Sequence, residues 1–391
     1  MKNTILFILL LLNGLCYSQS LNLNQGTIKN EDYFVELPFE YVNGKIIIPV
    51  KINDKTYKFL LDTGAPNCVF KNLNTVLNPE IVQSISVLDA NNNKSTMNVV
   101  KLPDIAIGNI IFQNAVALSS NDEGNLVLDC FKIDGFIGSN MLRNSIIQID
   151  TKNRILRITN KTEKLNFNKK SKIKLSLIGI QSNPYISLAI KGEKSVKEKV
   201  LLDTGMKGFY DISKKTYDLL KSKNIVAVIN TGSGTQDIGL FGNANMNEQL
   251  RILIPQINLA NATFLNITTV TTDDSNSRIG INLFEQGIGT IDYLHKKFYF
   301  DSYDENTVDL TEKLMGFSPT IIGNKLAVGI VWDENLKDQI YTGDEIIEVN
   351  GINYEHFQIC DFLSQKSIFK NVVISEITVK TKSGALKTIN L

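Results

Sequence analysis

The chain has 391 residues and is close to electrically neutral, with 41 Lys and Arg against 40 Asp and Glu. Charges of both signs are interspersed, so we expect no basic surface for nucleic acid and no nucleic-acid partner. The length exceeds what one hydrophobic core usually supports, which predicts several domains. The only histidines are His295 and His356, and neither stands at a metal-ligand spacing, so we expect no metal and no other cofactor.

Residues 1–20 have the pattern of a secretory signal peptide. Lys2 supplies a positive charge, an apolar run follows at 5–12, and small or polar residues at 18–20 offer a cleavage site. The run is shorter than the ~20 apolar residues that a membrane-spanning helix needs, and no later segment is predicted to span a membrane. We therefore expect export to the periplasm, the cell surface or the medium. Lipid attachment at Cys16 is the alternative, although Leu15 before it is larger than such sites prefer.

A duplicated tripeptide is the most informative feature of the chain. One apolar run ends in Asp62-Thr63-Gly64, and a second ends in Asp203-Thr204-Gly205. From average residue usage, about 0.1 such tripeptide is expected in a chain of this length, so coincidence is a poor explanation for two. Each is preceded by two apolar stretches around a polar turn, which is typical of a β-hairpin. These stretches are 46–52 and 57–61 in the first copy, and 185–190 and 196–202 in the second.

Each copy continues with matching elements. Phe136-Ile137-Gly138 leads to Asp150, and Arg278-Ile279-Gly280 leads to Asp292, with the same Gly-to-Asp spacing (150 − 138 = 12; 292 − 280 = 12). A predicted strand, turn and strand lie between, at 105–116 and 257–268. Long helical periodicity is nearly absent before residue 310. The chain up to residue 302 is therefore predicted to contain two β-rich units whose loops differ in length.

Together these motifs resemble the pepsin and retropepsin superfamily of aspartic proteases, in its two-lobed bacterial form. The resemblance covers about residues 40–302. It implies a mainly β fold with two β-barrel lobes, 40–160 and 175–302, joined by a basic linker at 161–174, and an active site at the lobe interface. Asp62 and Asp203 would be the catalytic pair, and Thr63 and Thr204 would interlock by hydroxyl-to-backbone hydrogen bonds. The other supporting residues would be Gly64, Ala65, Gly205, Gly138 and Gly280.

The chemistry of the implied pair suits peptide hydrolysis. Two adjacent carboxylates cannot both ionise cheaply, so they hold one proton between them. The ionised member activates a water, and the neutral member protonates the developing oxyanion. The pair titrates as a unit, so neither role is assigned to one residue. We expect a peptide or unfolded-protein substrate, and a monomer suffices because one chain supplies both aspartates.

Two stretches are candidates for the flap that closes over a substrate, and the sequence does not choose between them. They are 84–100, with its tip at 90–94, and the Gly-rich stretch 231–242. Residues 71–130 contain no tyrosine, so a pepsin-style flap tyrosine is missing.

Ala65 fits the family, whereas Met206 replaces the small residue that usually follows the second motif. Met206 keeps open a second interpretation, a catalytically inactive exported peptide-binding adaptor. A zymogen is a third, with little room for a propeptide at 20–39.

The C-terminal part has a different character. After a polar, acidic linker at 303–311, residues 341–351 resemble the Gly-Asp-x-Ile-x-x-Val-Asn-Gly segment of PDZ domains. The resemblance implies a small α+β PDZ domain over 312–391, with a helix at about 354–364. Met315, Gly316 and Phe317 would form a peptide-binding loop that could receive a protein C-terminus. The alternative is a domain that only packs on the protease.

Three cysteines follow the predicted signal peptide. Cys68 and Cys130 both lie in the first predicted lobe, and export would permit a disulfide between them. The sequence leaves open whether they pair or remain two buried thiols. Cys360 lies on the predicted C-terminal helix and is expected to be a packing residue.

Overall fold

The computed structural model describes residues 21–391, with gaps at 121–125, 236–237, 365–368 and 370–372. The predicted signal peptide and Cys16 lie outside the described residues. The fold is mainly β, with 51% of residues in strands and 11% in helices, as the sequence predicts. No helix within the described ranges is long and apolar enough to cross a membrane.

The first copy of the repeat builds an 11-stranded sheet within the described chain. β4 and β5 form a hairpin through a two-residue turn at Asn53 and Asp54, which both have positive φ angles, as hairpin turns of this length require. β5 then pairs in parallel with β12, so that Asp62 lies beside Gly138. The strands are β1 Thr27–Ile28, β3 Glu40–Val42, β4 Lys45–Ile52, β5 Lys55–Asp62, β6 Cys68–Val69, β7 Ile81–Leu88, β8 Lys94–Lys101, β9 Ile105–Ile107, β10 Ile110–Gln113, β11 Val116–Ser119 and β12 Gly135–Gly138, with helices α2 Lys71–Leu77 and α3 Leu126–Phe131.

The second copy repeats this arrangement inside a larger sheet. β16 and β17 form the hairpin, and β17 pairs in parallel with β24, which Gly280 follows. The strands of this part are β15 Lys172–Ile178, β16 Asn183–Lys191, β17 Ser195–Leu202, β18 Tyr210–Ser213, β19 Ala227–Gly234, β20 Ile238–Gly239, β21 Gly242–Asn243, β22 Asn247–Leu259, β23 Ala262–Thr272, β24 Arg278–Ile279, β25 Gly287–Asp292, β26 Lys297–Ser302 and β27 Thr307–Asp309. The helical elements are α5 Lys214–Lys221 and η2 Ile281–Leu283.

A shared layer of strands joins the two copies. After Gly138 the chain forms α4 Ser139–Leu142, β13 Ile146–Asp150 and β14 Ile155–Thr159. β13 pairs with β25 of the other copy, and β14 pairs with β2 Phe34–Pro38. One buried hydrophobic cluster extends from Tyr33 to Phe300 through both copies. The relative position of the two Asp-Thr-Gly loops is therefore set by sheet pairing and by a common core.

Both stretches that were predicted as linkers contain regular secondary structure. Residues 161–174 contain η1 Thr162–Lys164 and the start of β15, with Leu165 and Ser171 buried. Residues 303–311 contain β27, which pairs in parallel with β23. These elements are short and contain or adjoin polar and charged residues, so the sequence shows no alternation of apolar and polar residues that would predict them.

Residues 317–390 form a C-terminal unit with a hydrophobic cluster of its own, which includes Phe317, Val328, Ile346 and Ile377. The unit contains β28 Phe317–Ile322, β29 Lys325–Val331, η3 Glu334–Leu336, β30 Glu345–Val349, β31 Ile352–Asn353, α6 Ile359–Ser364, β32 Glu376–Lys380 and β33 Leu386–Asn390. The predicted helix begins five residues late, because the chain first turns at Tyr354, whose N–H donates to the Ile347 carbonyl.

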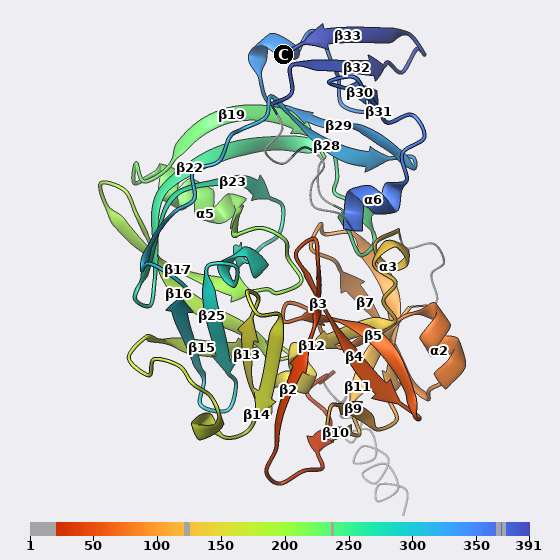
Figure 1. Cartoon of the computed structure of the whole chain (residues 1–391), viewed down its shortest axis with the longest axis vertical. Helices are drawn as coiled ribbons and strands as arrows, with labels where there is room; N and C mark the ends of the chain where they lie inside the picture. Colours follow the sequence, from red (N-terminus) through yellow and green to blue (C-terminus); the bar gives the residue numbers. More distant parts are fainter. Residues whose placement is uncertain (1–20, 121–125, 236–237, 365–368, 370–372) are drawn as a thin grey trace, which may run out of the picture.

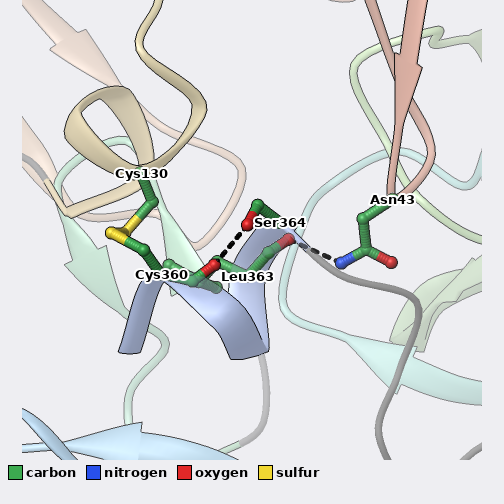
Figure 2. Close-up of a disulfide and its surroundings, with 5 residues drawn as sticks. All are labelled: Asn43, Cys130, Cys360, Leu363 and Ser364. Atoms are coloured by element: carbon green, nitrogen blue, oxygen red, sulfur yellow. Dashed lines mark hydrogen bonds between the residues drawn. A yellow bond between two sulfur atoms is a disulfide. The ribbon is translucent and has the colours of Figure 1, made fainter. Parts of the chain in front are cut away.

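The expectations for Cys130 and Cys360 were wrong, whereas Cys68 is a buried free thiol, as one of the two alternatives had it. Cys130 of α3 forms a disulfide with Cys360 of α6, 230 residues away (Figure 2). α6 also accepts a hydrogen bond at its Leu363 carbonyl from Asn43 Nδ2 (2.6 Å). The pairing depends on α3 and α6 lying side by side, as Figure 1 shows, and a sequence does not reveal such a contact between distant segments.

We predict that Cys360→Ser destabilises the protein by roughly 2–5 kcal/mol, because the disulfide restricts the unfolded chain. Thermal unfolding of the variant and of wild type, with and without reductant, checks this. The reduced wild-type protein should unfold at the same temperature as the variant. Reductant should barely change the unfolding temperature of the variant. Three reactive thiols in the denatured, unreduced mature protein, rather than the one of Cys68, would contradict the pairing.

Candidate active site

The two Asp-Thr-Gly motifs occupy equivalent ends of strands. Asp62 is the last residue of β5, and Asp203 directly follows β17. In both copies the preceding apolar run is buried, so the loop begins at the point where the strand leaves the core. The Asp203 N–H donates to the Ile279 carbonyl (2.9 Å), which ties this loop to β24.

The two threonines cross-link the loops. The Thr63 N–H donates to Thr204 Oγ1, and the Thr204 N–H donates to Thr63 Oγ1, both at 3.0 Å. Each hydroxyl in turn donates to the other copy, Thr63 to the Leu202 carbonyl (2.6 Å) and Thr204 to the Leu61 carbonyl (2.8 Å). Both side chains are fully buried. The expected reciprocal interlock is therefore present, and it fixes the two loops against each other.

The glycines allow each carboxylate to approach the opposite loop. A Cβ atom on Gly64 would lie 2.6 Å from the Asp203 Cγ, and one on Gly205 would overlap the Asp62 carboxylate. The carboxylates are held alike, since Asp62 Oδ1 accepts from the N–H groups of Gly64 (2.9 Å) and Ala65 (3.1 Å). Asp203 Oδ1 accepts from Gly205 and Met206 at the same two distances. The predicted pair is thus brought together with near-twofold symmetry.

Met206 packs beneath its loop instead of crowding it. Its side chain is buried, and its Cε lies 3.4 Å from where a Cβ on Gly208 would be and 3.2 Å from one on Gly280. Gly138 and Gly280 lie against the backbone of the two loops. Their N–H groups donate to Asn67 Oδ1 (2.9 Å) and to the Phe209 carbonyl (3.0 Å). A side chain at Gly138 would overlap the backbone of Pro66.

Burial and mutual repulsion dominate the electrostatics of the pair. They raise the pKa of Asp62 to about 7, with burial as the larger cause and the charge of Asp203 as the second. The charge of Lys45 and the N–H groups of Gly64 and Ala65 act in the opposite direction. Between about pH 4 and pH 7, Asp62 therefore holds its proton in the folded protein although it would lose it in the unfolded chain.

Two cations beside the pair were not predicted from the sequence. Arg278 Nη1 lies 3.7 Å from Asp203 Oδ2, and its Nη2 donates to Asp211 Oδ2 (2.8 Å). Lys45 lines the same cleft, and its Nζ donates to the Gly205 carbonyl. The sequence does contain a signal for Arg278, because this charged residue occupies the position that the apolar Phe136 has in the first copy. Lys45 is one of many lysines, and nothing in its spacing marks it.

A cleft of about 510 Å³ opens above the two carboxylates. Both flap candidates line it. The β7–β8 hairpin contributes Ile85 and Val87, and the 238–241 stretch contributes Leu240 and Phe241. The stretches are also joined to each other, because the Phe241 N–H donates to Asp89 Oδ2 (2.9 Å). Residues 236–237 of the second candidate lie outside the described chain.

Further residues complete the walls of the cleft. α3 contributes Val127 and Phe131 next to the disulfide, and Leu23 also lines the cleft. Leu23 is anchored by its N–H, which donates to the Ile180 carbonyl (2.9 Å). None of these residues was singled out from the sequence, because short apolar segments carry no sign of what they face.

The predicted peptide-binding loop lies away from this cleft. Within the described chain, the residues that line the cleft do not include Met315, Gly316 or Phe317. Phe317 is buried at the start of β28, and the Gly316 carbonyl accepts from the N–H groups of Trp332 (2.8 Å) and Asp333 (2.9 Å). The Met315 carbonyl accepts from Arg251 Nη1 (2.9 Å).

Comparison with known proteins bears on the first copy. Residues 48–141 match the family described as Aspartyl protease. The match supports an aspartyl protease of the retropepsin-like type. It includes Asp62-Thr63-Gly64 and Gly138, whereas the second motif and the C-terminal unit lie beyond it. No curated protein matches the chain significantly.

We predict that Asp62→Asn stabilises the protein at pH 8 by roughly 1–4 kcal/mol but has little effect near pH 4. Because the pKa of Asp62 is raised to about 7 in the folded protein, the unfolded chain loses this proton first, and stability falls as the pH rises from about 4 to about 7. A neutral Asn with the same acceptor atom removes that loss. Denaturant unfolding at several pH values checks this, with Asp304→Asn at an exposed position as control. A pH-independent difference between Asp62→Asn and wild type would contradict it.

Proposed function

We propose that the protein is an exported aspartic endopeptidase with two lobes, each supplying one aspartate, and a C-terminal PDZ domain. One observation carries the proposal: the Asp62 and Asp203 carboxylates each occupy the space beside the glycine of the other's loop. This arrangement requires two similar loops that face each other, and it places both acids at the floor of an open cleft.

The chemistry follows from the shared proton. With one carboxyl protonated, the ionised partner removes a proton from a water as that water attacks the peptide carbonyl carbon. The protonated carboxyl gives its proton to the carbonyl oxygen, which leaves a neutral tetrahedral diol. The carboxyl that took the proton from water then gives it to the amide nitrogen, while the other carboxylate removes a hydroxyl proton from the diol; the C–N bond breaks, a carboxylic acid and an amine are released, and the pair again holds one proton. The raised pKa of Asp62 supports this scheme, because it keeps a proton donor available below about pH 7.

The shape of the cleft supports an extended peptide as the substrate. Apolar side chains from the β7–β8 hairpin, from α3 and from Leu240 and Phe241 line it. A folded domain would be excluded by the two hairpin segments above the carboxylates. A peptide or an unfolded protein segment fits, and a single chain supplies the whole site.

Two lines of support concern the C-terminal unit and the location. The unit has its own core, and Gly316 precedes its first strand in the position that a PDZ loop would take, so we propose that it binds a peptide or a protein C-terminus. The Cys130–Cys360 disulfide favours an oxidising compartment, in keeping with export to the periplasm, the cell surface or the medium.

The inactive-adaptor alternative loses its main argument. It rested on Met206, and the Met206 N–H makes the same hydrogen bond to Asp203 that Ala65 makes to Asp62. The Met206 side chain points into the packing beneath the loop. The position therefore tolerates a long apolar residue without loss of the carboxylate contacts.

We predict that Asp62→Asn and Asp203→Asn each lower the cleavage rate of a denatured-protein mixture by three or more orders of magnitude, because neither residue alone can hold and exchange the proton. Peptide termini counted by mass spectrometry measure this, and a statine-type inhibitor should block the wild-type enzyme. Asp304→Asn is the matched control, since its side chain is 86% exposed. Undiminished cleavage by either variant would contradict the assignment.

We also predict that kcat/KM falls as the pH rises through about 7. Above that pH both carboxylates are ionised and no proton donor remains. Initial rates on a fluorogenic peptide between pH 3 and pH 9 check this, and a rate that stays constant up to pH 9 would contradict it.

A further inference from the structure

The two Asp-Thr-Gly loops are supported by different side chains at the same atom. The Gly64 carbonyl accepts a hydrogen bond from Gln181 Nε2 (3.2 Å), and the Gly205 carbonyl accepts one from Lys45 Nζ. Each donor belongs to the opposite copy of the repeat. The near-twofold symmetry of the site is therefore broken in one respect, because one donor is a neutral amide and the other is an ammonium group.

This asymmetry distinguishes two possible roles of Lys45, the hydrogen bond to the glycine carbonyl and the positive charge. Gln181 shows that a neutral donor is enough to hold the glycine carbonyl of such a loop, so the charge of Lys45 is not needed for that purpose. A buried ammonium group is costly unless negative charge lies nearby. Lys45 as a residue is partly exposed, but it lines the cleft, and its ammonium group donates to the carbonyl of Gly205, the glycine against which the Asp62 carboxylate lies.

The surroundings of Lys45 show what its charge acts on. Withdrawal from water lowers the pKa of Lys45, and the carboxylates of Asp62 and Asp203 counter this effect, while Arg278 adds to it. In return, Lys45 lowers the pKa of Asp62. Other titratable or charged groups that face the pair come from several elements: Cys68 on β6, Asp89 on the β7–β8 hairpin, Tyr185 on β16, Lys207 after the second motif, Asp211 on β18, Asp274 before β24, and Tyr293 after β25.

Arg278 has a different role from Lys45. Its guanidinium lies between Asp203, Asp211 and Asp274, with Asp211 the closest at 2.8 Å. Three carboxylates therefore share its single charge, and it contributes little to Asp62. Lys45 is the cation whose charge acts on Asp62, since its ammonium group is bound to the Gly205 loop that the Asp62 carboxylate touches.

We propose that Lys45 is a positioning residue whose ammonium group, held on the Gly205 carbonyl, favours the negatively charged form of the aspartate pair and so sets the pH range in which the enzyme works. This inference rests on the proposed protease function. It assigns Lys45 no proton transfer, since the shared proton stays on the two carboxyls. Without the ammonium group the pair would keep its proton to higher pH, and the activity profile would move towards alkaline values.

The test compares Lys45→Gln, which keeps a donor like that of Gln181, with Lys45→Arg, which keeps the charge. Lys51→Gln is the control, because Lys51 lies on the same strand with its side chain 54% exposed and paired with Asp54. We expect the alkaline limb of kcat/KM in Lys45→Gln to move up by about one pH unit, the lower end of what a neighbouring charge does. Lys45→Arg and Lys51→Gln should keep the wild-type midpoint.

A lower rate at every pH with an unmoved midpoint in Lys45→Gln would overturn the proposal, because a merely structural role predicts that result. A second readout needs no activity. The stability lost in Lys45→Gln should be larger at pH 8 than at pH 4, and this pH dependence should vanish in an Asp62→Asn background. If the wild-type protein cleaves no substrate, the proposed protease function is wrong. The unfolding measurements at pH 8 and pH 4 then still test whether the charge of Lys45 acts on the aspartate pair. Equal losses at both pH values would then refute its role.

Discussion

The crossed hydrogen bonds between Thr63 and Thr204 are the interaction on which the rest of the site depends. They are buried, they are reciprocal, and each hydroxyl also binds the strand end of the other copy. Burial of these polar groups is tolerated because every one of them has a partner. The loops can therefore adopt only one relative position, in which each aspartate touches the opposite glycine.

The larger architecture brings those loops into register and covers them. β13 pairs with β25, so the strands that follow each glycine lie in one layer. On the other side, the disulfide links α3, which lines the cleft, to α6 of the C-terminal unit. Asn43 extends this link, since it binds the Leu363 carbonyl of α6 and accepts from Lys207 beside the second motif (2.5 Å). Changes in the C-terminal unit thus have a direct structural route to the cleft.

Repeated local patterns made the centre of the site predictable. Asp62, Asp203 and their glycines follow buried strands in both copies, and the burial that defines those strands is visible as apolar runs. Lys45, Cys130 and Cys360 were not predictable in the same way, because their partners are defined only by the folded arrangement. For Met206 the sequence left open whether the side chain crowds the second loop or packs beneath it, because the residue type alone does not tell where a flexible side chain lies; the side chain is buried against Gly208 and Gly280.

The most direct measurement of the central claim is a carbon-13 NMR titration of the Asp62 carboxyl in wild type and in Asp203→Asn. We predict a pKa of Asp62 near 7 in wild type and a clearly lower one in the variant, where burial alone still raises it. An Asp62 pKa that is the same in both proteins, or an ordinary value near 4 in wild type, would contradict the claim that two carboxylates face each other and share one proton.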